Sequence, residues 1–158
     1  MAGNGLLLGI VGAKLPGVKL NYQPFAEDQL ILAAAAANPT PSRITMEELC
    51  RLPFIVRERG SGTRKSLEML LARQRYALDQ FNICATLGSS AAVKEAVKAD
   101  LGVSVISRHA VRDELESGTV REIEVTGWSM TRSFFVVTSP KRTMPHHYRV
   151  FLDRLLGK

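Results

Sequence analysis

The feature of this sequence that most constrains its fold is a repeated order of short apolar strand, glycine-containing turn and amphipathic helix. Residues 54–57 (FIVR) have the composition of a buried strand and lead into the turn at residues 60–63 (GSGT). Leu67, Leu70 and Leu71 then follow at the i, i+3, i+4 spacing of one helical face. Strands that alternate with helices in this way build a parallel sheet, so the segment predicts the α/β class.

The same order returns twice along the chain. Residues 82–87 (NICATL) precede the turn at residues 88–90 (GSS) and a helix with a narrow apolar stripe. Residues 101–106 (LGVSVI) precede a helix that Ser107 caps and Gly118 ends. We therefore expect a parallel sheet with right-handed crossovers, and a ligand outside the carboxyl ends of its strands.

The flanking segments add further strands and two helices. Residues 6–11 predict a strand, and a β-rich stretch at 18–22 is broken by residues 23–25 (QPF) before another strand at 29–34. Thr45 and Glu48 have the spacing of a capping box. Strands are also expected at 121–125 and 134–138, followed by a helix with a buried stripe of Tyr148, Phe151, Leu152 and Leu155.

Composition limits the classes of protein that fit. The chain has 158 residues, 46% of them hydrophobic, which is enough for one folded domain. The longest apolar runs, residues 6–13 and 30–37, are far shorter than the ~18 residues of a membrane span. No basic segment of a secretory signal follows Met1, so we expect a cytoplasmic protein. Cys50 and Cys84 form no CxxC pair, and we interpret both as reduced core thiols without metal or disulfide.

The chemistry-bearing residues point to anion binding and away from catalysis. A P-loop would need glycine in place of Arg59 and Arg64, there is no GxSxG motif, and no His spacing suits a metal. We therefore predict no catalytic residues, no metal and no cofactor. Free amides and hydroxyls at the start of a helix attract anions. The candidate effector-binding residues lie in the turns after the three strands: Ser61, Gly62, Thr63, Ser89, Ser90 and Ser107.

The order of the segments resembles the effector-binding domain of LysR-type transcriptional regulators, starting partway through that domain. The resemblance rests on collinear pieces across nearly the whole chain. They include residues 8–12 (LGIVG), 57–64 (RERGSGTR), 87–94 (LGSSAAVK), 97–107 (VKADLGVSVIS) and 134–137 (FFVV).

The resemblance implies a fold similar to type II periplasmic binding proteins, with one complete α/β subdomain and part of a second. Residues 1–33 would be a partial first subdomain and a crossover strand, and residues 34–134 the second subdomain. Residues 135–158 would be the return strand and a C-terminal helix packed on the first subdomain. The family's helix-turn-helix has no counterpart in this sequence, so we expect DNA binding only through a domain absent from this chain.

The function implied is a ligand-sensing module in which a small anionic metabolite or oxyanion controls transcription. Self-association as a dimer or larger is expected from the same resemblance. A solute-binding protein of a transport system is the alternative, and an enzyme on the same fold is a third possibility that lacks an acid or base group. The net charge of +6 is dispersed, with no run of five basic residues, which does not favour DNA binding by the chain itself.

Overall fold

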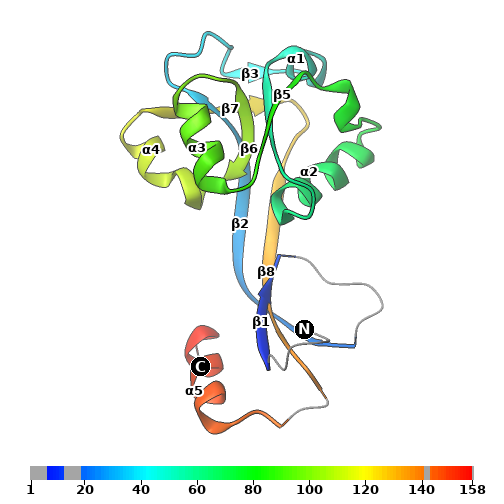
Figure 1. Ribbon diagram of the computed structural model, residues 1–158, viewed down its shortest axis with the longest axis vertical. Helices are drawn as coiled ribbons and strands as arrows, with labels where there is room; N and C mark the ends of the chain where they lie inside the picture. The colour runs from blue at the N-terminus through cyan, green and yellow to red at the C-terminus, as the bar shows by residue number, and fades with distance from the viewer. Residues whose placement is uncertain (1–6, 13–18, 141–142, 158) are drawn as a thin grey trace. The chain divides into compact units, whose positions relative to one another are not determined.

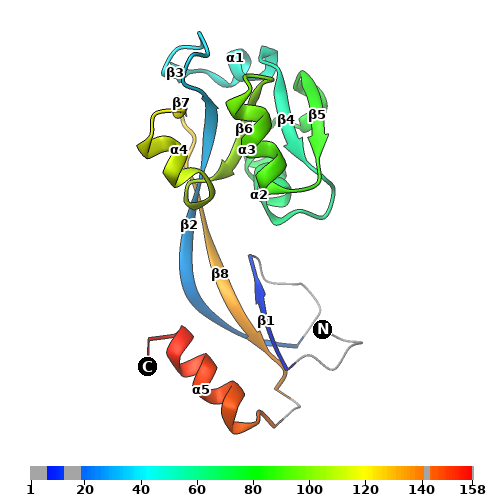
Figure 2. The ribbon, with the colours of Figure 1, turned by 60° about the vertical axis from the view of Figure 1, so that its left-hand side comes forward.

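The computed structural model describes residues 7–12, 19–140 and 143–157, and every structural statement below refers to them. The strands and helices are drawn in Figures 1 and 2. Their order is β1 (Leu8–Val11), β2 (Asn21–Ala35), β3 (Arg43–Ile44), α1 (Met46–Arg51), β4 (Phe54–Arg57), α2 (Gly62–Arg73), η1 (Leu78–Gln80), β5 (Ile83–Leu87), α3 (Ser90–Lys98), β6 (Val103–Ser107), η2 (His109–Val111), α4 (Arg112–Glu116), β7 (Val120–Val125), β8 (Met130–Thr138) and α5 (His146–Leu155).

The chain divides into two compact units. One unit comprises residues 1–28 and 132–158, and the other comprises residues 29–131. The larger unit contains all three predicted strand–turn–helix segments. The α/β class is confirmed, because strands and helices alternate through this unit.

The sheet of the larger unit is mixed, whereas the sequence analysis predicted a parallel one. β4 pairs in parallel with both β5 and β6, so the three predicted strands are parallel neighbours (Figure 2). β2 runs antiparallel to β6 and β7, with Leu30 opposite Ser107 and Leu32 opposite Ile123. The sequence pattern missed this because residues 29–34 look the same in either direction of pairing.

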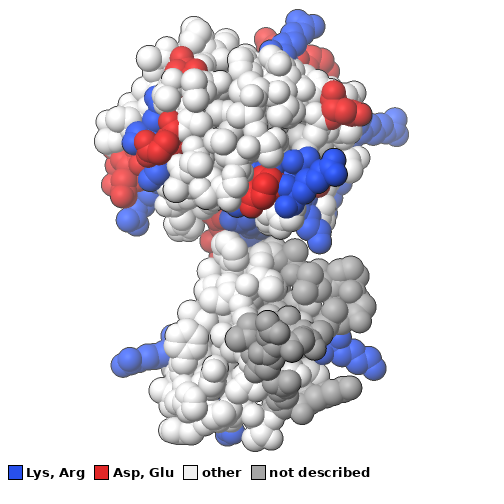
Figure 3. All heavy atoms as spheres, in the orientation of Figure 1, with Lys and Arg blue, Asp and Glu red and all other residues white. Residues whose placement is uncertain are grey.

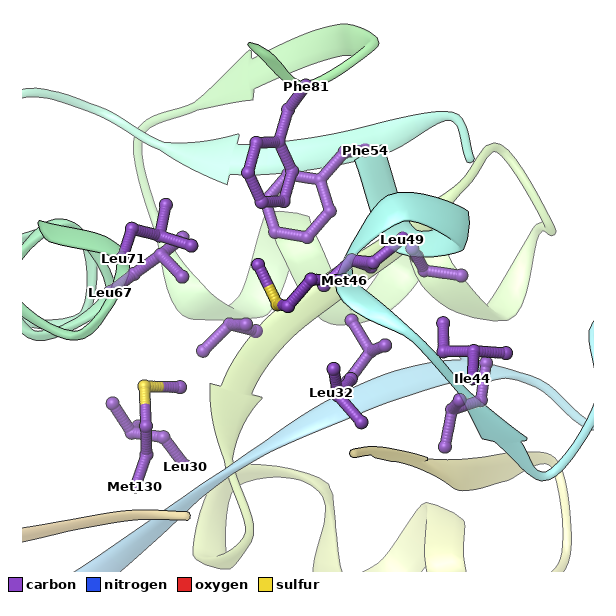
Figure 4. Close-up of a cluster of buried hydrophobic side chains, with 14 of the residues drawn as sticks. Leu30, Leu32, Ile44, Met46, Leu49, Phe54, Leu67, Leu71, Phe81 and Met130 are labelled. Atoms are coloured by element: carbon purple, nitrogen blue, oxygen red, sulfur yellow. The ribbon is translucent and has the colours of Figure 1, made fainter. Parts of the chain in front are cut away.

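Alternating side chains of the central strands fill two separate cores, one on each face of the sheet. In β4, Phe54 and Val56 belong to one buried cluster and Ile55 belongs to the other. The first cluster is shown in Figure 4, where the rings of Phe54 and Phe81 meet edge to face at a centroid distance of 5.1 Å. A sheet covered on both faces needs near-continuous apolar strands, which explains the FIVR sequence.

The helix starts follow the predicted signals closely. The Thr45 hydroxyl accepts the Glu48 backbone N–H and the Glu48 carboxylate accepts the Thr45 N–H, so the capping box is present. The segment after Ser107 is a 3-10 turn followed by the short α4, where one continuous helix was expected. Gly118 ends it with a φ of 70°, as predicted for a C′ residue.

The predicted break at residues 23–25 is wrong, because β2 continues through Pro24 as one strand of 15 residues. The first part of β2 lies beside β8, and its pairing with β6 begins only at Leu30. Proline has no N–H to donate, but a strand that has a neighbour on one side tolerates this. The predicted strand near the N-terminus is present as β1, which pairs antiparallel with β8.

An ion pair within the smaller unit joins β2 to β8. The Arg132 guanidinium donates from Nε and Nη2 to Oδ2 of Asp28, at 2.9 and 2.6 Å. Asp28 is only 2% exposed, and the side chain of Arg132 is 14% exposed. Arg132 also lies over the Phe134 ring, 4.8 Å from its centroid. A hydrogen-bonded pair is the usual condition for burying a charged carboxylate.

Two further expectations about burial are wrong. No residue of α5 is buried, and Phe151 of the expected stripe is 52% exposed. Cys84 is also exposed, because β5 pairs with β4 and ends the order of strands at that side of the sheet. Cys50 is partly buried, and both thiols are free.

Candidate functional site

Ser61 and Ser89 are the N-caps of the two helices that follow β4 and β5. The Ser61 hydroxyl accepts the backbone N–H of Arg64 at 3.5 Å, and the Ser89 hydroxyl accepts that of Ala92 at 3.1 Å. Ser61 is 7% exposed and Thr63 is 8% exposed. The capping role accounts for these residue types locally, and it also points free backbone amides beyond each helix start.

Ser107 follows the same pattern at the end of β6. Its hydroxyl lies 3.4 Å from the backbone nitrogen of Ala110, which donates to it. β6 pairs in parallel with β4, so the carboxyl ends of β4, β5 and β6 meet at one edge of the sheet. The predicted residues therefore occupy three neighbouring turns.

Arg57, which is not among the predicted effector-binding residues, connects the two helix starts. Its Nη1 donates to the Ser90 hydroxyl at 2.7 Å, and its backbone carbonyl accepts Nη1 of Arg64 at 3.1 Å. The Arg57 side chain is 15% exposed. Its place as the last residue of a strand before GSGT was a signal, but its partner Ser90 lies 33 positions away and becomes a neighbour only in the fold.

Glu58 holds the Arg57 guanidinium in a fork. Arg57 donates from Nε to one carboxylate oxygen of Glu58 at 2.7 Å and from Nη2 to the other at 2.9 Å. These hydrogen bonds lower the pKa of Glu58 below its usual value, so the carboxylate stays charged. The arrangement fixes the plane of the guanidinium.

Three hydroxyls of the site accept hydrogen bonds and keep their own protons for another partner. Ser61, Ser89 and Ser90 each accept an N–H, from Arg64, Ala92 and Arg57 respectively. A serine hydroxyl has one O–H donor besides its lone pairs. Within the described parts of the chain, no acceptor takes the O–H of these three serines. Their chemistry suits a ligand rich in acceptor oxygens.

A hollow of about 460 Å³ lies against the start of α2. Its lining comprises Arg59, Gly60, Ser61, Arg64, Lys65 and Glu68. The Glu68 carboxylate accepts a hydrogen bond from Nε of Arg64 at 2.8 Å. Among the described residues, no carboxylate forms an ion pair with Arg59 or Lys65. In Figure 3, basic side chains gather over the region of α2. The hollow thus carries more positive than negative charge.

The structure brings the candidate residues to one edge of the sheet, and Arg57 connects the turn after β4 to Ser90. Ser61 lines the hollow, while Ser89, Ser90 and Ser107 do not. The Arg64 guanidinium packs back on the Arg57 carbonyl and on Glu68. A separate cavity of about 80 Å³ beside β2, β7 and Trp128 contains none of the candidates.

The described ranges contain neither a metal-binding cluster nor a membrane-spanning helix. No group of three or more His, Cys, Asp or Glu side chains that could hold a metal ion occurs in the described ranges. The three histidines are exposed. None of the described helices is both long enough and apolar enough to cross a membrane.

The chain matches known proteins over nearly its full length. The model of the LysR substrate binding domain family matches residues 4–158. The uncharacterized HTH-type transcriptional regulator YeiE of Escherichia coli K12 is 33% identical over 147 residues, which are 92% of this chain and 49% of that protein. The phosphonates import ATP-binding protein PhnC of Anaeromyxobacter dehalogenans is 39% identical over 147 residues, 92% of this chain but only 30% of that protein.

A solved structure shows the same fold. The regulatory domain of CcmR from Synechocystis PCC6803, in complex with 2-PG, aligns with a TM-score of 0.87 and 29% sequence identity. The alignment covers 99% of this chain and 75% of that one. The transport alternative is not favoured, because the shared fold is that of a LysR regulatory domain and most of the PhnC protein has no counterpart here.

The chain spans about half or less of the length of these two curated relatives. The predicted family and the type II periplasmic-binding-protein-like fold are both confirmed. The match to the family covers residues 4–158, and the strand–turn–helix units that suggested it are present in the structure. The chain therefore belongs to the LysR substrate-binding domain family and is an effector-binding domain of the LysR type.

Proposed function

We propose that the chain binds a small anionic metabolite or oxyanion at the carboxyl ends of β4, β5 and β6, and that this binding controls transcription through a DNA-binding domain of a longer protein. The observation that carries the proposal is the set of hydroxyls at Ser61, Ser89 and Ser90 that accept N–H groups and retain their O–H donors. The site would also include Gly62, Thr63 and Ser107.

Charge and helix geometry support an anion. The starts of α2 and α3 offer backbone amides and the positive end of the helix dipole. Arg59 and Lys65 add positive charge at the hollow. A carboxylate, phosphate or sulfur oxyanion fits such a donor set, and a cation does not.

The family resemblance extends the proposal to partners. We propose one complete subdomain, residues 34–134, flanked by parts of another at residues 1–33 and 135–158. Self-association as a dimer or larger is consistent with apolar side chains that are exposed in each unit, such as Met69 and Phe151, at 51% and 52%. The chain would act in the cytoplasm, as part of a regulator protein of this family that carries an HTH domain.

Titration tests the proposed site. Inorganic phosphate, sulfate, acetate and 2-PG are added to the ¹⁵N-labelled chain, and the amides of Arg64 and Ala92 are followed. Thr63→Ala should weaken binding by ~1.5 to 3 kcal/mol, the contribution of a charge-assisted hydrogen bond. Ser61→Ala and Ser89→Ala should weaken it as well.

Ser117→Ala is the matched control, because this exposed serine lies at the end of α4. It should leave the affinity unchanged. If a probe binds and the three variants in the turns retain the affinity of the unchanged chain, the ligand site lies elsewhere. If none of the four probes binds, the anionic effector is refuted.

A further inference from the structure

The side chain of Arg57 links the turn after β4 to the start of α3. Its guanidinium uses Nε and Nη2 on Glu58 and Nη1 on Ser90, and its carbonyl anchors Arg64. An arginine can only donate hydrogen bonds. The Ser90 hydroxyl is therefore the acceptor in the 2.7 Å contact with Nη1.

This direction of donation determines what Ser90 can do next. With one lone pair engaged by Arg57, the hydroxyl proton of Ser90 points away from the guanidinium. Within the described ranges no acceptor receives that proton. Ser90 is the first residue of α3, a helix of nine residues, so its hydroxyl lies beside the backbone amides that open the helix.

The serine at the start of α2 has a similar arrangement. Ser61 is 93% buried, since only 7% of its surface is exposed, and it lines the hollow at α2. Its hydroxyl accepts the Arg64 N–H and likewise has no acceptor for its own proton among the described residues. Two serines on different helices thus present O–H donors, and Arg57 connects their turns.

We propose that Arg57 is a positioning residue of the effector site, which orients the Ser90 hydroxyl so that its proton is donated to the bound anion. The proposal rests on the proposed function. Arg57 acts through Ser90 and does not itself supply the charge that the anion meets, because Glu58 accepts two of its N–H groups and balances its charge.

The fork explains why arginine stands at this position. The planar guanidinium meets both oxygens of Glu58 and still reaches Ser90 with a third N–H group. A lysine ammonium is a point charge on a flexible stem and cannot make this fixed three-way contact. The plane of the Arg57 guanidinium, and with it the direction of the Ser90 O–H, depends on the ion pair between Arg57 and Glu58.

A double-mutant cycle tests the proposal with the same four probes: inorganic phosphate, sulfate, acetate and 2-PG. Arg57→Met and Ser90→Ala should each weaken binding of the probe about tenfold, the effect of one lost hydrogen bond to an ion. The double variant should bind no more weakly than either single variant, because Arg57 acts through the Ser90 hydroxyl.

Two more variants complete the design. Arg57→Lys keeps the charge and, if Arg57→Met does not fold, replaces it in the cycle; its affinity should also fall about tenfold because the fork is lost. Arg43→Met removes an exposed arginine that pairs with Glu124, which controls for the general loss of one positive charge. It should change the affinity less than twofold.

The outcomes separate this proposal from the proposed function. If no probe binds the unchanged chain, the anionic site itself is wrong and both fall. If a probe binds and Arg57→Met or Arg57→Lys retains full affinity, only the role of Arg57 is refuted. If the double variant binds about a hundredfold more weakly, so that the effects of Arg57→Met and Ser90→Ala multiply, Arg57 contacts the anion directly and the positioning role is wrong.

Discussion

Replacing Asp28 by leucine probes the buried ion pair that joins β2 and β8. The Asp28 carboxylate is 2% exposed and accepts two N–H groups of Arg132 on one oxygen. Leucine has a similar size but no charge, so the substitution leaves a cationic guanidinium that is 14% exposed without this carboxylate. The cost of removing one partner of a buried ion pair should dominate the result.

The expected magnitude follows from this burial. Removal of one partner of a buried pair costs about 3 to 5 kcal/mol. The Phe134 ring, 4.8 Å from the Arg132 guanidinium carbon, keeps a favourable contact with the cation, so we expect the lower end, about 3 kcal/mol. The double variant Asp28→Leu/Arg132→Met removes both charges and should be within about 1 kcal/mol of the unchanged chain.

Amide hydrogen exchange measures the effect in the unit that contains the pair. The amides of Val136 and Val137, which are 1% and 0% exposed in β8, should lose protection by about two orders of magnitude in Asp28→Leu. Trp128 fluorescence during urea unfolding reports on the other unit separately.

An exposed ion pair provides the control for this experiment. Arg43 and Glu124 have side chains that are 68% and 58% exposed, so Glu124→Gln should cost less than about 1 kcal/mol. The reasoning is refuted if Asp28→Leu costs no more than Glu124→Gln. It is also refuted if Asp28→Leu/Arg132→Met costs as much as the sum of Asp28→Leu and Arg132→Met measured singly.

Two other substitutions follow from local geometry. Gly102→Ala should destabilise the larger unit by at least about 2 kcal/mol in urea unfolding, because the added Cβ would lie 2.5 Å from the Pro53 carbonyl oxygen. Gly88→Ala is the control and should cost less than about 1 kcal/mol, because a Cβ added there would meet no neighbouring side chain or backbone within 4 Å. Equal costs for the two substitutions would contradict the argument. The hydrogen bond from Lys94 lowers the pKa of Glu114 below its usual value. The ionised Glu114 therefore stabilises the folded state at a pH above its usual pKa, and this contribution is lost as the pH falls through the lowered pKa of the folded state. Glu114→Gln should therefore unfold with a weaker dependence on pH in acid, and an unchanged acid profile would contradict this assignment.

The candidate site was predicted in part. The turns that contain Ser61 and Ser89 could be located because glycine and serine follow apolar strands and precede helical spacing, and both residues cap helices as expected. Parallel pairing of β4, β5 and β6 places these turns at one edge, as a parallel sheet requires. The role of Arg57 could not be predicted, because a contact with Ser90 depends on the neighbouring positions of two strands. Whether the predicted residues hold the effector stays a prediction.

Local chemistry in the sequence determined where strands and helices begin, since apolar periodicity, capping hydroxyls and glycine turns act within a few residues. The capping box at Thr45 and the FIVR strand are examples. Only the tertiary structure decided that β2 passes through Pro24 unbroken, that Cys84 is exposed and that α5 has no buried face. Burial and strand direction depend on which segments lie beside a residue, and a local pattern contains no information about partners distant along the chain.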